Sequence, residues 1–505
     1  MFALTYLAMG LFPLLSMMIF LRFGMQRGIV WTAMLGFLFL PVRPTFDPPL
    51  LPTIDRRTLT ITCVVVFAAL MAKGRGWRAD KSDYTANSWL PKSKLFTLLI
   101  ILAVFSSIGT YFTNRDSGHT PHGYLFAFEL LDIGRMSYEI MFPALLLIVG
   151  RRFLSDEKGI YCLLKAAGFT GVIYGLLIVF EWRMSPVLKL WVYGIYDIDW
   201  GLVAREYGFR PVVFLENGLQ TAIFHAMACV SAVAVFRGST GGDRTLWRSI
   251  ALFNLACLPF TQSAAAIILG FAFSALAFFG TKKLILMAVA SVAFVSMTYP
   301  VTRTLDVVPT QTLLSAASII SERRAGSLRT RFTSEDRYLV RAKNRPYFGW
   351  GQRIREMPRD SRDRPAATPD GFWVIMVAQR GLIGFAAIFG LFTLPLMLLW
   401  VKRRIAPINH AVLGLGVVVS VAVADNLLNA SFTPMLWLCS GILLGISERV
   451  LYREADQAAI ERRSALELER RKRRGETALA GSHSGTVLAT ARDGAKRHGL
   501  EHARR

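Results

Sequence analysis

Cysteine and histidine, the residues that most often build disulfide frameworks and metal centres, are scarce in this sequence. The 505 residues include five cysteines and seven histidines. Each cysteine lies inside an apolar run and none forms a CxxC pair, which is typical of small buried side chains. We therefore expect no structural disulfide, no metal site and no cofactor. Between Val301 and Asp370, the longest polar stretch of the chain, histidine does not occur.

Acidic residues are also few relative to basic ones. The chain has 58 Lys and Arg against 34 Asp and Glu, a formal net charge of +24. Nothing in it resembles a nucleic-acid-binding module, so the excess does not indicate a nucleic-acid partner. The N-terminus lacks a basic segment and a small-residue cleavage site, so we expect a retained helix and not a signal peptide.

Apolar blocks of membrane-spanning length are abundant, and 53% of the residues are hydrophobic. The 35 Phe and 11 Trp suit lipid-facing helices with interfacial anchors. We predict an all-α polytopic integral membrane protein of roughly 12–13 transmembrane helices, one large periplasmic loop and a charged cytoplasmic C-terminal tail. The predicted spans are Phe2–Leu21, Gly28–Val42, Thr58–Ala72, Leu95–Thr113, Met136–Gly150, Ile160–Trp182, Leu219–Phe236, Leu246–Phe260, Ala264–Phe279, Leu284–Pro300, Gly381–Val401, Ala411–Leu428 and Pro434–Ile446.

These spans divide the chain into four parts. The parts are transmembrane helices over 1–300, the large periplasmic loop over 301–370, C-terminal transmembrane helices over 371–447, and a basic tail over 448–505, partly disordered. The short basic loops and the tail fall on one side, which we assign to the cytoplasm, where they face anionic lipid. The segments predicted on the opposite side are 43–57, 114–135, 183–218 and 301–370.

The large loop is rich in arginine, against the usual bias for that side, which suggests that its arginines serve a ligand. Guanidinium is always charged and presents a planar fork that fits phosphate oxygens. Arg337 and Arg341 lie four residues apart in EDRYLVRAKN, which predicts a helix with both on one face. Glu335 and Asp336 stand just before Arg337, and pairing with nearby arginines is the alternative role for this group.

The segment RPYFGWGQ, residues 345–352, predicts a sharp turn, because its glycines allow close backbone approach. Trp350 in this turn has two interpretations. It can stack on a sugar, or it can be part of a structural turn that packs on the membrane surface.

Two carboxylates stand where apolar runs begin. Asp370 precedes Gly371, and Glu216 follows the segment AREYGFR, in which Arg205 and Arg210 bracket an aromatic pair. A partly desolvated carboxylate at such a place can serve as a general base. The competing role of both residues is to begin a helix, and for an isolated Asp that role is the commoner one.

Asp425 and Asn426 lie at the outer end of a late predicted span. An ionisable residue within a span marks a functional site by default. The alternative is a hydrogen-bonded contact between helices.

Three stretches, the last of them followed by ADNLLNA, together resemble the O-antigen ligase and polymerase superfamily, in a branch similar to exopolysaccharide polymerases. They are REYGFRPVVFLENG, FTQSAAAIILG and SLRTRF…EDRYLVRAKNRPYFGWGQ…DGFWVIMVAQRGLIG. The resemblance covers about Arg205 to Gly445. The family commonly has His-Asn before the helix that follows the large loop, where this chain has Asp370-Gly371.

The resemblance implies a membrane glycosyltransferase of the bacterial inner membrane. Its donor would be a glycan on undecaprenyl pyrophosphate, and its acceptor another lipid-linked glycan or a lipid. The transfer would invert the anomeric centre without a nucleotide sugar or an essential metal. The implied pyrophosphate-binding residues are Arg205, Arg210, Arg331, Arg337 and Arg341. The candidate catalytic residues, chosen for their own chemistry, are Asp370 and Glu216, supported by Trp350, Asp425 and Asn426.

Two other classes of protein compete with this one. A transporter or flippase for lipid-linked or anionic solutes should show paired broken helices and repeat symmetry, and the sequence indicates neither. A non-catalytic membrane scaffold or sensor with a basic tail would leave the arginines of the large loop unexplained.

Overall fold

A computed structural model describes most of the chain outside its C-terminal tail. The described residues are 2–46, 53–73, 88–91, 93–120, 123–320, 322–352, 355–358, 370–404, 408–430 and 434–449. The chain separates into two units, Met1–Glu448 and Arg449–Arg505. The predicted tail therefore lies outside the described residues, apart from its first two positions, and so does the part of the large loop at 359–369.

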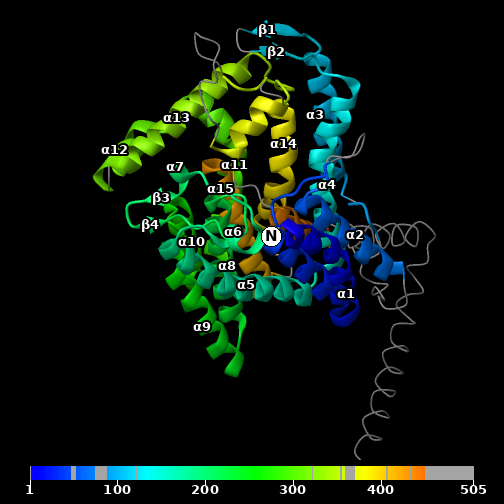
Figure 1. The fold of residues 1–505 in the computed structure, drawn as a ribbon, viewed down its shortest axis with the longest axis vertical. Helices are drawn as coiled ribbons and strands as arrows, with labels where there is room; N and C mark the ends of the chain where they lie inside the picture. The colour runs from blue at the N-terminus through cyan, green and yellow to red at the C-terminus, as the bar shows by residue number, and fades with distance from the viewer. Residues whose placement is uncertain are drawn as a thin grey trace, which may run out of the picture. The chain divides into compact units, whose positions relative to one another are not determined.

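Helices make up nearly all the regular structure of the described residues (Figure 1). Eight of them are long and apolar enough to cross a membrane, which supports a multi-pass membrane protein. They are α1 (Phe2–Phe39), α3 (Lys94–Thr113), α4 (Leu130–Phe153), α5 (Glu157–Met184), α8 (Gly218–Gly238), α11 (Lys282–Thr304), α14 (Phe372–Val401) and α15 (His410–Leu428).

The remaining elements are shorter or more polar. They are α2 (Arg56–Lys73), α6 (Leu188–Tyr193), α7 (Trp200–Val203), α9 (Gly241–Cys257), the 3-10 helix η1 (Leu258–Thr261), α10 (Ala264–Phe279), α12 (Thr310–Ile320), α13 (Glu322–Lys343) and a helix over 434–449. Two small hairpins pair β1 (Gly118–Thr120) with β2 (Gly123–Leu125), and β3 (Ala204–Arg205) with β4 (Gly208–Phe209). Every predicted apolar block is mainly helical, so the all-α class is confirmed, and the count of roughly 12–13 transmembrane helices stays a prediction.

Helix α1 folds back on itself at Gly24. That residue has a φ of 79°, which breaks the helix. Thr5 Oγ1 donates to the Tyr193 carbonyl at 2.9 Å, and the Tyr193 hydroxyl donates to the Phe39 carbonyl at 2.5 Å. The two ends of a straight helix of this length would lie about 50 Å apart, so α1 is a hairpin. Its halves correspond to the two predicted spans, Phe2–Leu21 and Gly28–Val42.

Helix α14 folds back in the same way at Gly381, which has a φ of 66°. The rings of Phe372 and Phe389 lie 5.9 Å apart, whereas a straight helix would separate these positions by about 25 Å. The second half matches the predicted span Gly381–Val401. The first half, 372–380, was not predicted as a helix of its own.

One end of the bundle gathers the segments that carry the basic short loops. Arg151 Nε, at the end of α4, donates to Glu448 Oε2 at 2.5 Å, and the Ser93 amide donates to Glu448 Oε1. Gln26, in the turn of α1, donates to Asp156. We call this the inner end, and its assignment to the cytoplasm stays a prediction.

The segments predicted on the opposite side also gather together, and we call their end the outer end. Arg57, at the start of α2, donates to Glu216 at 2.5 Å. Arg345, beyond α13, donates to Asp116, beyond α3, at 3.0 Å. In Figure 1, α12 and α13 lie at the same end of the view as β1 and β2.

Helix α8 is the most deeply buried of the eight spans. Its Ala, Ser, Gly and Cys residues let neighbouring helices approach closely. A methyl group added at Gly414 of α15, for example, would meet Ala234 of α8 at 2.4 Å. The loop before α8 is consequently held at the centre of the outer end.

Candidate functional site

The β3–β4 hairpin carries Arg205 and Arg210 and is fixed to the end of α5. Gly208 makes the turn with a φ of 96°. The Trp182 indole N–H donates to the Tyr207 carbonyl at 2.7 Å, and the Arg210 amide donates to the Val203 carbonyl at 2.8 Å. These bonds hold the backbone from which both arginines project.

A buried carboxylate in α5 fixes the segment that follows. Glu181 is fully buried, and its Oε2 accepts from the amides of Val212 and Val213 at 2.8 and 2.7 Å. Its Oε1 accepts from the Leu188 amide at 3.0 Å. Three N–H groups satisfy the buried charge, and the contacts pin the chain two residues after Arg210. Glu181 was not among the predicted site residues, although an acid inside an apolar run is a recognised signal.

Arg205, Arg210 and Arg331 form a group that we call the outer arginine cluster. Arg210 Nη2 donates to the Gln262 carbonyl at 3.4 Å, while its Nε is buried and has no hydrogen-bond partner among the described residues. Burial and the nearby charges of Arg205 and Arg331 lower the pKa of Arg210 to about 10. The cluster is therefore short of negative charge.

Arg331 of α13 contacts two further segments, the start of α14 and the end of α15. Its Nε lies 3.5 Å from Asp370 Oδ2, and its Nη1 donates to the Leu428 carbonyl, at the end of α15, at 3.2 Å. The Asp370 side chain is 39% exposed. The Phe372 amide of α14 donates to the Asn429 carbonyl at 3.2 Å. The three stretches that carry the family resemblance, together with ADNLLNA, thus meet around Arg210 and Arg331.

Helix N-termini add positive potential at this place. A methyl group at Gly218, the first residue of α8, would meet the Arg210 side chain at 2.5 Å. Helix α10 begins two residues after Gln262, and α14 begins two residues after Asp370. The N-caps of α10 and α14, Ser263 and Gly371, supply no capping side-chain hydrogen bond. Helix N-termini of this kind favour anions.

Asp425 and Asn429 form a local hydrogen-bonded contact beside the cluster. Both are 2% exposed, and Asn429 Nδ2 donates to Asp425 Oδ1 at 2.6 Å. Because the Asn429 carbonyl also accepts from α14, the pair joins two helix ends, which agrees with the helix–helix alternative. Asn426 is equally buried.

An ion-pair group borders the cluster on α13. Arg303, at the end of α11, is 4% exposed and lies 3.2 Å from Glu335 and 2.7 Å from Asp336. Burial raises the pKa of Glu335 to about 7, although Arg303 opposes the shift. Both acids pair with an arginine as expected, and the partner, Arg303, lies in the last turn of α11, at the start of the predicted loop.

Glu216 lies in a different setting from Asp370. It lies 2.5 Å from Arg57 and 3.5 Å from Arg56, and it accepts from Gln220 at 3.0 Å. Burial would raise its pKa, but the charges of Arg57 and Arg56 outweigh burial and lower it. A carboxylate held in this way is a weak base, so these contacts favour a structural role at the start of α8.

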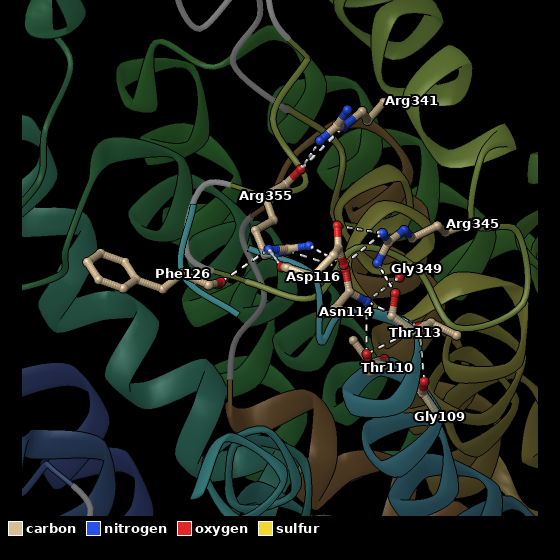
Figure 2. A network of polar contacts seen from close by, with 10 residues as sticks. All are labelled: Gly109, Thr110, Thr113, Asn114, Asp116, Phe126, Arg341, Arg345, Gly349 and Arg355. Carbon is tan, nitrogen blue, oxygen red and sulfur yellow. Dashed lines mark hydrogen bonds and ion pairs between the residues drawn. The ribbon is translucent and has the colours of Figure 1, made fainter. Parts of the chain in front are cut away.

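Arg341, Arg345 and Arg355 belong to a separate group, which we call the Asp116 network (Figure 2). Arg345 and Arg355 both donate to Asp116, at 3.0 and 2.9 Å. Arg355, 2% exposed, also donates to the carbonyls of Asp116 and Phe126, and Arg341 donates to the Arg355 carbonyl at 2.9 Å. Burial would raise the pKa of Asp116, but Arg345 and Arg355 outweigh it and lower the pKa.

Trp350 is enclosed by this network. The guanidinium carbons of Arg341 and Arg345 lie 3.6 and 4.1 Å from its ring centre, and two groups this close must occupy the two faces. Its indole N–H donates to the Arg341 carbonyl at 2.8 Å. With both faces covered, Trp350 suits the structural turn and not sugar stacking.

The turn at 346–351 forms backbone hydrogen bonds with α14 on both sides of its break at Gly381. The Trp350 and Gly351 amides donate to the carbonyls of Ala378 and Gln379, each at 2.8 Å. The amides of Leu382 and Ile383 donate to the carbonyls of residues 346 and 347. A side chain at residue 349 or 381 would collide with the opposing backbone. The glycines are needed for this close approach.

Among the implied pyrophosphate ligands, Arg337 lies exposed on α13 and Arg341 belongs to the Asp116 network. Within the described ranges, no three His, Cys, Asp or Glu side chains group closely enough to hold a metal ion. No protein-family model matches the chain, and a search of curated proteins finds no similar sequence.

Proposed function

We propose that this chain is a membrane glycosyltransferase. It would take a glycan from undecaprenyl pyrophosphate on the outer face of the bacterial inner membrane and transfer it to a lipid-linked glycan or another lipid. The observation that carries the proposal is the outer arginine cluster, in which the charges of Arg205 and Arg331 act on Arg210 and Arg331 contacts Asp370. Such a cluster is a binding site for a strongly anionic group.

A pyrophosphate fits this cluster better than a carboxylate or a sugar alone. Its several oxygens can accept from Arg205, Arg210 and Arg331 together, and the N-termini of α10 and α14 face the same place. Arg210 Nε, which is buried without a partner, would gain an acceptor. The isoprenoid tail of such a donor would stay among the membrane helices.

In the proposed reaction, a hydroxyl oxygen of the acceptor attacks the anomeric carbon of the donor sugar. The bond from that carbon to the pyrophosphate oxygen breaks, and its electron pair leaves with the pyrophosphate. The arginines stabilise the charge on the leaving group. Asp370, which is partly exposed and contacts Arg331, takes the hydroxyl proton.

The transporter alternative is less well supported. Helices α1 and α14 are both broken at a glycine, but each break is the turn of a hairpin at one end of the bundle. Transport sites form where helices unwind near the middle of the membrane. The polar density of the described residues instead lies at the outer end.

The decisive experiment is an analysis of lipid-linked glycans in a strain that lacks the gene. Accumulated single repeat units would indicate a polymerase, and full-length lipid-linked chains a ligase. Normal surface polysaccharide and no accumulation would contradict the proposal. A reporter inserted after Asp306, whose side chain is 91% exposed, tests the sidedness. A cytosolic signal would overturn the assignment of the outer end.

A further inference from the structure

Two adjacent arginines end α4 at the inner end, and we call them the inner arginine pair. Arg151 has no exposed side-chain surface, and its Nε and Nη1 donate to Glu448 and to the Ser88 carbonyl. Arg152 lies 4.2 Å above the centre of the Trp89 ring. The pair therefore sits where the starts of α3 and of the basic tail meet the end of α4.

The inner arginine pair has more N–H groups than acceptors. Arg151 Nη2 and Arg152 Nε and Nη1 are buried and have no hydrogen-bond partner in the described parts of the chain. Glu448 contacts Arg151, and the charge that acts on Arg152 is that of Arg151, so among the described residues the two guanidinium groups have one carboxylate partner. Helix C-termini favour basic residues, but that preference does not account for buried N–H groups without acceptors, because each costs free energy.

The surroundings indicate which anion would supply the acceptors. Trp89, which contacts Arg152, is 37% exposed, and Leu90 and Leu95, which follow it along the chain, are 67% and 46% exposed. Tryptophan is enriched at the level of lipid headgroups. Basic sites between transmembrane helices on the cytoplasmic side bind the headgroups of anionic phospholipids.

We infer that the inner arginine pair binds the phosphodiester of an anionic phospholipid, whose acyl chains lie against Trp89, Leu90 and Leu95. The phosphate oxygens accept from Arg152 and from the remaining nitrogen of Arg151. The net positive charge of the pair with Glu448 selects an anionic lipid over a zwitterionic one. This site is separate from the outer arginine cluster and does not depend on the proposed function.

The test uses the full chain, purified in neutral detergent and stripped of lipid. Bound lipid is counted by native mass spectrometry, and the unfolding temperature is measured, with phosphatidylglycerol, phosphatidylcholine or inorganic phosphate added. We expect saturable phosphatidylglycerol binding that raises the unfolding temperature. Phosphatidylcholine binds more weakly, and inorganic phosphate produces no comparable rise because it has no acyl chains.

Arg152→Gln should weaken phosphatidylglycerol binding about tenfold, the loss expected for one charge-assisted hydrogen-bonding group. Arg248→Gln is the matched control, because it removes an exposed arginine from α9, in the basic loop predicted on the same side, and should bind like the wild type. If Arg152→Gln does not fold, Arg152→Lys keeps the charge, loses the planar fork and should still bind more weakly.

Unchanged phosphatidylglycerol affinity in the Arg152 variants would overturn the inference. Equal binding of phosphatidylcholine would also overturn it, because the net charge would then play no part. Stabilisation by inorganic phosphate alone would identify a soluble anion as the ligand and not a lipid.

Discussion

The two arginine groups at the outer end differ in how completely their partners satisfy them. In the Asp116 network, Arg355 donates to three carbonyl or carboxylate groups and is buried, and Asp116 accepts from two arginines. In the outer arginine cluster, Arg210 keeps a buried N–H without an acceptor and lies near two other arginines. Arginines at the outer end thus stabilise the structure in the Asp116 network, whereas Arg210 keeps an N–H donor for a ligand in the outer arginine cluster.

The sharpest test exchanges the carboxylate of each group for an amide. Asp370→Asn should lower glycan transfer by roughly 100-fold or more, because it removes the proposed base, and should leave the unfolding temperature nearly unchanged. Asp116→Asn is the matched control, and should lower the unfolding temperature while the folded fraction stays active. Transfer assays in membranes and thermal unfolding in detergent measure both. If Asp116→Asn lost transfer and Asp370→Asn lost stability instead, the structural and functional roles of the two arginine groups would be exchanged.

Removing one cation from the cluster should have the next largest effect. Arg210→Ala should slow transfer about 100-fold, since it removes one donor to the leaving group. Its stability should not fall, because the buried N–H and the repulsion from Arg205 and Arg331 disappear together. Arg183→Ala, an exposed arginine at the end of α5, is the control and should be as active as the wild type. A transfer rate in Arg210→Ala equal to that of the control would remove Arg210 from the site.

The raised pKa of Glu335, which lies beside the outer arginine cluster, predicts that the stability of the protein depends on pH. Its pKa is about 7 in the folded chain against an ordinary 4.5, because burial favours the protonated form. The stabilisation by the protonated carboxyl group is complete below about pH 4.5 and is lost as the pH rises through about 7, a change of about 3 kcal/mol. Glu335→Gln should therefore lose less stability than the wild type between pH 5 and 8. If the unfolding temperatures of Glu335→Gln and the wild type changed in parallel with pH, Glu335 would be ionised over the whole range and the prediction would be wrong.

Trp350→Phe should have the smallest effect. It keeps an aromatic ring between Arg341 and Arg345 and loses the indole hydrogen bond, worth about 1 kcal/mol. Transfer kinetics should stay close to those of the wild type. A clear rise in KM for the glycan donor would instead bring the ring into the site.

The helices were predictable because length and hydrophobicity alone identify a membrane-spanning block. The hairpin of α1 was also visible, since the charged and glycine-containing stretch 22–27 separates two apolar blocks. The first half of α14 was not, because its nine residues are too short for a span and only the fold-back at Gly381 distinguishes them.

The candidate site was predictable as a set of segments but not as a set of contacts. Arg331 and Arg341 lie on one helix with similar neighbours, and only tertiary packing directs the first to Asp370 and the second to the Arg355 carbonyl. The same holds for the two carboxylates proposed as bases. Nothing local to Glu216 reveals that Arg57, more than 150 residues earlier, neutralises it.

The backbone hydrogen bonds between the turn at 346–351 and the break in α14 limit how the protein can be engineered. Four backbone groups of α14 depend on that turn for their hydrogen bonds. A tag, an epitope or a shortened linker placed there would strip partners from a helix in the membrane, where water is not at hand to replace them. Labels for microscopy or accessibility assays belong near Asp306, upstream of α12, where the chain makes no such joint.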